Sequence, residues 1–440
     1  MESADTLIHA RWIVPVAPRG RVLEDHSLVL RDGRILDCLP TPEAQDRYRA
    51  PAELTLDRHA LIPGLVNAHT HAAMNLLRGL ADDLPLMTWL QEHIWPAEQR
   101  FVTPEFVFDG TELAMAEMLR GGVTCFNDMY FHPDETARAA DQAGMRAVVG
   151  LIVLDFPTAW ASGPEDYLRK GLALHDEYRD HPLVRTAFAP HAPYTVSDEP
   201  LARILTLAEE LDLPIHMHVH ETADELDQSL KAHAVHPLAR LERLGLLSPR
   251  LLAVHMTQLS SGEIDTVARH GVQVIHCPES NMKLASGACP VAALLAAGVN
   301  VALGTDGAAS NNDLDLFGEM RSAALLGKLT AADAAAVPAP AALEMATLGG
   351  ARALGLDDEI GTLEVGKAAD VVAVDLGPVE ALPLYDVVSQ LVYATGRHQV
   401  TDVWVAGRHL LKDRALTTLD ETAIADKARL WARRIQEARP

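Results

Sequence analysis

The sequence predicts an α/β protein built as a (β/α)8 TIM barrel, with a small composite β-sandwich domain formed from both termini. Apolar strand candidates alternate with amphipathic helical stretches through the middle of the chain, which is typical of parallel β-structure. Eight such units lie between residues 61 and 358, a length that fits a barrel with insertions. Reactive polar residues also stand at the ends of several strand candidates. These three observations together favour the barrel.

The eight strand candidates are short and apolar, and amphipathic stretches such as 105–120 and 200–211 separate them. A doubly wound open sheet fits the same alternation, and periodicity alone does not exclude it. The polar strand ends favour the barrel, because there they converge on one face. The candidates are residues 61–68, 123–126, 146–154, 184–189, 214–219, 251–254, 271–275 and 300–303.

The two ends of the chain differ from its middle. Short strand candidates lie at 6–15 and 27–30, and the same style returns at 369–374 and 400–407. Two β-rich ends around a different middle indicate one small β-domain assembled from both termini. We expect a composite β-sandwich from 1–60 and 359–415, a catalytic barrel over 61–358, and a C-terminal helix over 416–440.

Composition narrows the classes of function. The net charge is −24, from 37 basic and 61 acidic side chains, and this field would repel nucleic acid and anionic membranes. The four cysteines show neither Cys-x-x-Cys spacing nor a disulfide pattern, which fits a reducing cytoplasm. No apolar run reaches the ~20 residues that span a bilayer. We expect a soluble cytoplasmic enzyme without a signal peptide.

Histidines and one aspartate follow the strand candidates. His69 and His71 end the first strand, and they point to the same side because side chains in a strand alternate with a period of two. In a barrel the strand ends meet around one centre, whereas in an open sheet they would be spread along a line. The other such residues are His191, His216, His218, His220, His255 and Asp306.

Imidazole and carboxylate ligands suit a divalent cation such as zinc, with one position left open for water. His69, His71, His218 and Asp306 would supply that coordination, although spacing alone does not separate His218 from its two neighbouring histidines. A second metal usually needs a bridging anion such as a carbamylated lysine, but His191 ends strand four and no lysine lies nearby. We therefore expect one Zn²⁺ per chain, with Fe²⁺ or Mn²⁺ as alternatives.

Five motifs then point to one family. They are residues 63–71, 191–194, His218 with Glu221, His255, and 304–312. Together with the β-rich ends they resemble the amidohydrolase superfamily, TRZ/ATZ-type branch, over essentially the whole chain. The His-x-x-Glu offset of that family selects His218 as the metal ligand.

Within the branch, residues 77–84, Trp89, Glu98 and 280–284 look most similar to deaminases of 5′-methylthioadenosine and S-adenosylhomocysteine. The resemblance implies catalytic roles for Glu221, His255 and Asp306. It also implies substrate contacts from Trp89, Glu98, His191 and Glu221. Arg146 is the candidate contact for a homocysteine carboxylate, but it starts its strand, so we expect methylthioadenosine to be the better substrate.

The expected reaction is zinc-dependent hydrolytic deamination of an adenine nucleoside, giving the inosyl product and ammonia. Glu221 would protonate ring N1, Asp306 would accept the proton of water, and His255 would orient that water. Hydrolysis of guanine, pterin or triazine-type heterocycles is the alternative. A metal-binding scaffold without activity has no need of Glu221 and Asp306 beside the metal. We also expect a homo-oligomer, a small-molecule nucleoside substrate, and neither nucleic-acid nor membrane partners.

Overall fold

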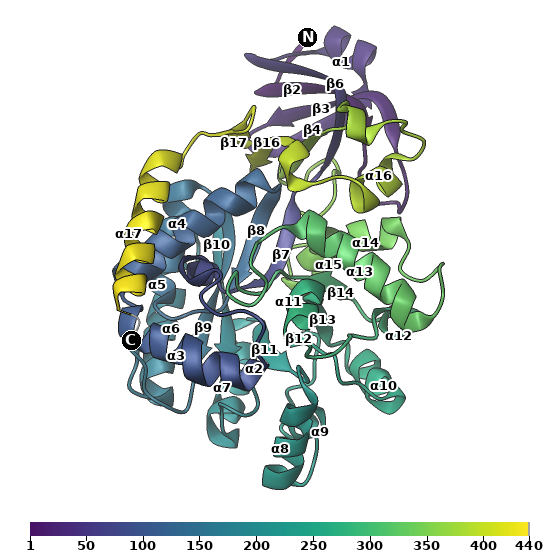
Figure 1. Cartoon of the computed structure of the whole chain (residues 1–440). Coiled ribbons are helices and arrows are strands. Elements are labelled where there is room, and N and C mark those ends of the chain that lie inside the picture. The colour runs from purple at the N-terminus through teal and green to yellow at the C-terminus, as the bar shows by residue number, and fades with distance from the viewer. Residues whose placement is uncertain (439–440) are drawn as a thin grey trace.

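The computed structural model describes residues 1–438. Within them, eight parallel strands stand side by side in chain order around the centre of the molecule (Figure 1). This arrangement confirms the predicted (β/α)8 barrel. The strands are β7 (Leu65–Thr70), β8 (Val123–Asp128), β9 (Arg146–Val153), β10 (Val184–Pro190), β11 (Ile215–Val219), β12 (Leu251–His255), β13 (Gln273–His276) and β14 (Val301–Leu303).

The barrel closes between β14 and β7 through a side chain. Asn67 Nδ2 donates to Thr305 Oγ1 at 2.8 Å, and the backbone N–H of Thr305 donates to Asn67 Oδ1 at 3.0 Å. One backbone hydrogen bond follows, in which Asp306 N donates to the carbonyl of His69. Gly304 allows this approach, because a Cβ there would lie 2.8 Å from the backbone nitrogen of His69. The same closure brings Asp306 beside His69.

Helices cover the outside of the barrel. The helix α4 begins where the Thr103 hydroxyl accepts from Phe106 N, with Pro104 in its first turn, and it ends at Gly121. The covering helices are α4 (Pro104–Arg120), α5 (Pro133–Ala143), α6 (Pro164–Tyr178), α7 (Asp198–Leu211), α8 (Ala223–His233), α9 (Pro237–Arg243), α10 (Ser261–His270), α11 (Pro278–Lys283), α12 (Val291–Ala296), α13 (Leu316–Ala331), α14 (Ala339–Met345) and α15 (Leu348–Ala353).

A helical insertion follows β7 and lies over the carboxyl ends of the strands. It carries Trp89 and Glu98, which the sequence analysis assigned to substrate binding. Its elements are the 3₁₀ helix η1 (Ala72–Leu77), α2 (Leu86–Thr88), the π-helical turn η2 (Trp89–Ile94) and α3 (Trp95–Phe101).

The chain ends form a second sheet, in which the purple N-terminal strands lie beside β16 and β17 in Figure 1. The central pair joins the two ends of the chain, because β6 pairs with β15 from Pro63↔Val371 to His59↔Asp375. Strands from both termini therefore build one sheet, which confirms that a separate β-structure is formed from both ends of the chain. They are β2 (Thr6–Ile13), β3 (Leu23–Arg31), β4 (Arg34–Pro40), β6 (Ala52–Pro63), β15 (Val371–Asp375), β16 (Val400–Val405), β17 (Arg408–Lys412) and β18 (Ala415–Leu416).

Smaller elements complete this end of the molecule. They are β1 (Glu2–Ser3), α1 (Thr41–Arg47), β5 (Tyr48–Arg49), η3 (Val379–Ala381), α16 (Val387–Tyr393) and η4 (Arg397–Gln399).

The first strand candidate, 61–68, is divided in the structure. Residues 61–63 finish β6 in the terminal sheet, and the barrel strand begins at Leu65. Gly64 separates them at a tight contact, because a Cβ there would overlap the side chain of Thr124. One apolar run therefore supplies strands to two sheets.

The C-terminal helix α17 (Glu421–Glu437) packs along α4, and the last two residues of the helix expected over 416–440 lie outside the described part. Asp420 begins it by accepting from the backbone of Thr422 and Ala423. Trp431 Nε1 donates to Asp109 Oδ2 at 2.9 Å, which fixes the helix on the barrel. None of the helices in residues 1–438 has the length and apolarity needed to cross a membrane.

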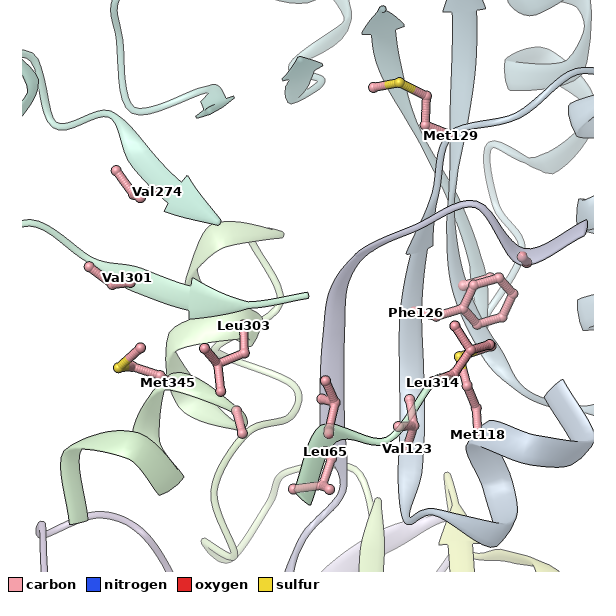
Figure 2. Packing of buried hydrophobic residues seen from close by; sticks show 14 of the residues in the cluster. Leu65, Met118, Val123, Phe126, Met129, Val274, Val301, Leu303, Leu314 and Met345 are labelled. Atoms are coloured by element: carbon pink, nitrogen blue, oxygen red, sulfur yellow. The ribbon is translucent and has the colours of Figure 1, made fainter. Parts of the chain in front are cut away.

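Apolar side chains pack on both faces of the barrel strands. Leu65, Val123 and Phe126 pack outward against Met118 of α4 and Leu314 (Figure 2). The opposite faces of the strands fill the barrel interior with small and branched side chains. This inner cluster includes Val66, Ala68, Cys125, Val148, Ala187, Leu252, Val254, Ile275 and Ala302.

Candidate metal centre and active site

Four side chains meet at the carboxyl ends of β7, β11 and β14. His69, His71, His218 and Asp306 each present one ligand atom, and these atoms all lie within 4.8 Å of one another. Asp306 Oδ1 is 3.3 Å from His69 Nε2 and 3.2 Å from His71 Nε2. The structure thus brings together the four residues that the sequence analysis proposed as metal ligands.

Hydrogen bonds on the far side of two imidazoles aim them at this centre. His71 Nδ1 donates to the carbonyl of Met129 at 2.5 Å, and His218 Nδ1 donates to the carbonyl of His191 at 2.8 Å. These bonds place a proton on Nδ1 and turn Nε2 toward the cluster, which is the usual orientation of metal-binding histidines.

The two neighbouring histidines, His216 in β11 and His220 just after it, have other partners. The ring of His216 is fully buried between His69 Nδ1, at 2.8 Å, and Asn127 Nδ2, at 3.2 Å. His220 Nδ1 donates to the carbonyl of Gln258, and its Nε2 accepts from Leu238 N. Since backbone groups occupy both ring nitrogens of His220, this residue links loops and has no proton free for the cavity.

Glu221 follows His220 and lines the cavity beside the cluster. Burial, aided by the negative charge of Asp306, raises the pKa of the Glu221 carboxyl to about 8, so it holds its proton at neutral pH. Its Oε2 lies 3.8 Å from His255 Nε2. Its backbone N–H donates to Glu225 Oε2 at 2.7 Å, and this contact holds the loop in place.

Glu225 is a residue that the sequence analysis missed. Its carboxyl accepts from the backbone of both His220 and Glu221. The signal that could have found it is the Thr-x-x-Glu spacing from Thr222 to Glu225 at the start of α8, which is typical of a helix N-terminus.

Asp306 is a buried carboxylate that stays ionised. Burial opposes its charge, but the hydrogen bonds from His69 and His71 hold its pKa well below the usual range. The backbone N–H of Gly307 donates to Oδ1 at 2.8 Å. A protonated Glu221 and an ionised Asp306 therefore face the same cavity, the pairing that general acid–base chemistry needs.

The cavity beside the cluster has a volume of about 570 Å³. Trp89 and Glu98 of the insertion line it, together with His191 after β10. Tyr130 Oη donates to Glu98 Oε1 at 2.8 Å, and Tyr130 is a second residue that the sequence analysis missed, for which no motif gave a signal. Burial raises the pKa of Glu98 to about 7 although Tyr130 opposes the shift.

His191 stands in the cavity wall as a neutral ring. Its Nδ1 lies 3.0 Å from Thr195 Oγ1, and its ring centroid is 4.9 Å from that of His218. Burial and the nearby His71 lower its pKa to about 3. It can offer a hydrogen bond to a ligand without adding charge.

Arg146 lies apart from these residues. It begins β9 at the opposite end of the barrel, where its Nε and Nη2 are each 3.2 Å from the carboxylate oxygens of Asp370, and Glu359 lies at 3.3 Å. It does not line the cavity. The expectation that Arg146 contacts the substrate does not fit this position, because the buried Asp370 and the partly exposed Glu359 already occupy its guanidinium.

The chain belongs to the amidohydrolase family, whose model matches residues 60–410. Its site, with metal-ligand, acid and base groups around one cavity, is that of a metal-dependent hydrolytic enzyme.

Particular relatives are similar over nearly the whole chain. A 5-methylthioadenosine/S-adenosylhomocysteine deaminase of Saccharophagus degradans is 53% identical, with 99% of this chain and 98% of the relative covered. That of Teredinibacter turnerae is 52% identical, with 98% of each covered.

Among solved structures, an adenosine deaminase of Xanthomonas campestris with bound zinc superposes with a TM-score of 0.98. It is 55% identical, covering 99% of this chain and all of the other. The zinc-bound atrazine chlorohydrolase of Arthrobacter aurescens has a TM-score of 0.90 at 23% identity, covering 97% of this chain and all of the other, and this likeness concerns the fold alone.

Proposed function

We propose that the protein is a zinc-dependent deaminase of adenine nucleosides, which converts 5′-methylthioadenosine, S-adenosylhomocysteine or both to the inosyl product and ammonia. One observation carries the proposal: a protonated Glu221 shares a cavity with the four-residue cluster and with Glu98. The relatives named as deaminases of these nucleosides, at 52–53% identity over nearly the full length, support it.

The cluster fits zinc. Three imidazoles and one carboxylate are its usual ligands, and two of the imidazoles already face inward. The zinc named in the similar adenosine deaminase structure supports this choice over Fe²⁺ or Mn²⁺. Zinc held there would supply a nucleophile from water at neutral pH. We propose one ion per chain, held by His69, His71, His218 and Asp306.

Protein groups would move the protons. Asp306 accepts a proton from water as the oxygen adds to C6 of the adenine ring. The Glu221 carboxyl gives its proton to ring N1 in the same step, and His255 contacts the reacting oxygen. The proton on Asp306 then passes to the amino group, which leaves as ammonia, and the hydroxyl proton on the C6 oxygen returns to Glu221. Adenine nucleoside and water thus become the 6-oxo product and ammonia, with atoms and charge balanced.

The rest of the cavity fits a nucleoside better than a free base. Glu98, fixed on one oxygen by Tyr130, can accept from the ribose hydroxyls, and the Trp89 indole can cover the base or the thioether. Guanine, pterin and triazine substrates lack a ribose diol for this carboxylate. Nucleosides are therefore the proposed substrates, with His191 as a further contact.

The side chains that line the cavity also indicate which 5′ substituent it accepts. Apolar side chains such as Leu86, Leu90 and Phe156 make up much of the wall. Within residues 1–438, no arginine or lysine lines the cavity, so the homocysteine carboxylate would lack a cationic partner there. We propose that 5′-methylthioadenosine is the preferred substrate.

A substrate panel tests this function. Ammonia release and the absorbance change on deamination would be measured for 5′-methylthioadenosine, S-adenosylhomocysteine, adenosine, adenine, guanine and a pterin. We expect methylthioadenosine to have the highest kcat/KM and free bases to react about 10⁴-fold less well. If guanine or a pterin exceeded every nucleoside, the substrate assignment would be wrong.

Two further points complete the proposal. We place the protein in the cytoplasm, which the four free cysteines support. A homo-oligomer stays a prediction, and light scattering of the purified protein would decide it.

A further inference from the structure

The short helix α11 carries the sequence Ser280-Asn281, to which the proposed mechanism gives no role. Both side chains are fully buried, although both are polar. Ser280 contacts Asp306 of the proposed metal cluster, and Asn281 contacts His255. Such buried polar residues require partners. Ser280 Oγ and Asn281 Nδ2 have theirs among the reacting groups, whereas Asn281 Oδ1 has no hydrogen-bond partner within residues 1–438.

Ser280 holds one oxygen of Asp306. Its hydroxyl donates to Asp306 Oδ2 at 2.6 Å, while Oδ1 faces the Nε2 atoms of His69 and His71. The two carboxylate oxygens therefore have different environments. If the hydroxyl were removed, Oδ2 would lose the hydrogen bond that keeps it turned away from the histidines.

Asn281 holds the ring of His255. Its Nδ2, at 2.9 Å, can only donate, so His255 Nδ1 accepts and the ring carries its proton on Nε2. That Nε2 points toward the Glu221 carboxyl. His255 is then a hydrogen-bond donor in the cavity. The reverse arrangement, with Asn281 accepting, would make Nε2 an acceptor.

A third side chain anchors the helix. Lys283 Nζ donates to Asp82 Oδ1 at 2.6 Å and to the carbonyl of Ala309 at 3.3 Å. Asp82 lies in the insertion that carries Trp89, between η1 and α2, and Ala309 follows Asp306 by three residues. The helix is thus attached to both loops that border the site.

We propose that Ser280 and Asn281 are positioning residues. Ser280 sets the rotation of the Asp306 carboxylate, so that one oxygen faces the metal ligands, and Asn281 sets the tautomer of His255, so that it donates into the cavity. This inference rests on the proposed deaminase function. It assigns a role to α11 beyond packing.

The first test compares Ser280→Ala and Asn281→Ala with the wild-type holoenzyme on 5′-methylthioadenosine. A hydrogen bond to a charged or reacting group changes rates by about 10- to 100-fold. We therefore expect kcat to fall by that factor, with KM and zinc content near wild type. Met282→Ala is the control on the same helix, because Met282 is exposed and lies outside the cavity lining.

Two conservative variants separate positioning from packing. Ser280→Thr keeps the hydroxyl and should restore most of the kcat lost in Ser280→Ala. Asn281→Asp keeps the shape but can only accept, so it should lose at least as much kcat as Asn281→Ala. An Asn281→Asp enzyme more active than Asn281→Ala would overturn the assigned tautomer.

The visible absorption of the Co²⁺-loaded protein gives a readout independent of turnover. Ser280→Ala should change this spectrum, because Asp306 Oδ2 loses its hydrogen bond from Ser280, whereas Asn281→Ala should not. Unchanged spectra together with kcat within about twofold of wild type would overturn the proposal, as would zinc loss that accounts for the lost activity. A wild-type enzyme inactive on all nucleosides would instead overturn the proposed function, and the Ser280→Ala spectrum would still test Ser280.

Discussion

Glu221 and Asp306 are buried carboxyls of one cavity whose surroundings move their pKa in opposite directions. Because Glu221 is buried and lies near a negative charge, its pKa rises to about 8. Asp306 has two imidazole partners that outweigh burial, and its pKa falls. When the surroundings of two carboxyls push their pKa values apart, the one with the raised pKa can act as the acid and the one with the lowered pKa as the base. The chemistry of the site therefore depends on the partners of each carboxyl.

Replacing Glu221 by Gln tests its role as the acid. The amide keeps the size of the side chain but has no transferable proton, so turnover of 5′-methylthioadenosine should fall by about 10²-fold or more. Metal content should stay near wild type, because Glu221 is not in the cluster. Steady-state kinetics and metal analysis check both points. Retained turnover would mean that another group protonates the ring.

If Glu98 binds the ribose as proposed, binding of nucleosides should depend on pH. Ribose hydroxyls donate best to an ionised carboxylate, and burial raises the pKa of Glu98 to about 7. The kcat/KM for methylthioadenosine should therefore rise as pH increases through about 7, until deprotonation of Glu221 lowers it again. Glu98→Gln should remove the rising limb and lower kcat/KM. A rising limb that survives in Glu98→Gln would contradict the assignment.

At the scale of elements, the barrel depends on a closure that is not a regular strand ladder. The pair of bonds between Asn67 and Thr305 stands between β7 and β14, the first and last strands. Three site residues then leave their strands with positive φ: His220 at 54°, His255 at 76° and Asp306 at 62°. A backbone conformation with positive φ costs about 1–3 kcal/mol for each such residue, so the surrounding barrel closure has to stabilise it.

Asn67→Ala should destabilise the protein. The change leaves the buried N–H of Thr305 without its acceptor, which costs about 1–3 kcal/mol in the free energy of unfolding. Urea unfolding of the metal-loaded protein measures this. Thr305→Ser, which keeps both the hydroxyl and the N–H, is the control and should stay near wild type. Equal stability of Asn67→Ala and wild type would show that the closure does not depend on this pair.

The elements show what the sequence could predict. Alternating apolar and amphipathic stretches indicated all eight barrel strands, because parallel strands are buried on both faces. The division of 61–68 between two sheets was not predictable, since the apolar run continues from Leu61 across Gly64 to Val66 and only tertiary pairing separates the two strands. The catalytic histidines could be found from strand ends, whereas the partners of His220 come from distant loops.

At the scale of the molecule, a buried ion pair links the barrel to the terminal sheet. Arg146 and Asp370 are both buried, and Asp370 immediately precedes β15. Spacing in the sequence could not reveal this pair, because the two residues are 224 positions apart. Arg146 is the candidate that the sequence offers for a homocysteine carboxylate, but in the structure Asp370 occupies its guanidinium.

Arg146→Ala should affect stability and spare substrate choice. Removing one partner of a buried ion pair costs about 3–5 kcal/mol in the free energy of unfolding, because Asp370 stays buried and charged. The ratio of kcat/KM for methylthioadenosine to that for S-adenosylhomocysteine should not change. Arg185→Ala, which removes a half-exposed arginine that pairs with Glu359, is the control and should cost ~1 kcal/mol or less. A changed ratio would return Arg146 to the substrate site.

The most direct test of the central claim is the reaction of zinc-loaded protein with 5′-methylthioadenosine in water enriched in ¹⁸O, followed by mass spectrometry and ammonia determination. Hydrolytic attack at C6 predicts 5′-methylthioinosine carrying one oxygen from water, with one ammonia for each product molecule. The His71→Asn protein, which lacks one proposed ligand, should form neither. Release of adenine, or an inosyl product without the label, would contradict the proposed deamination.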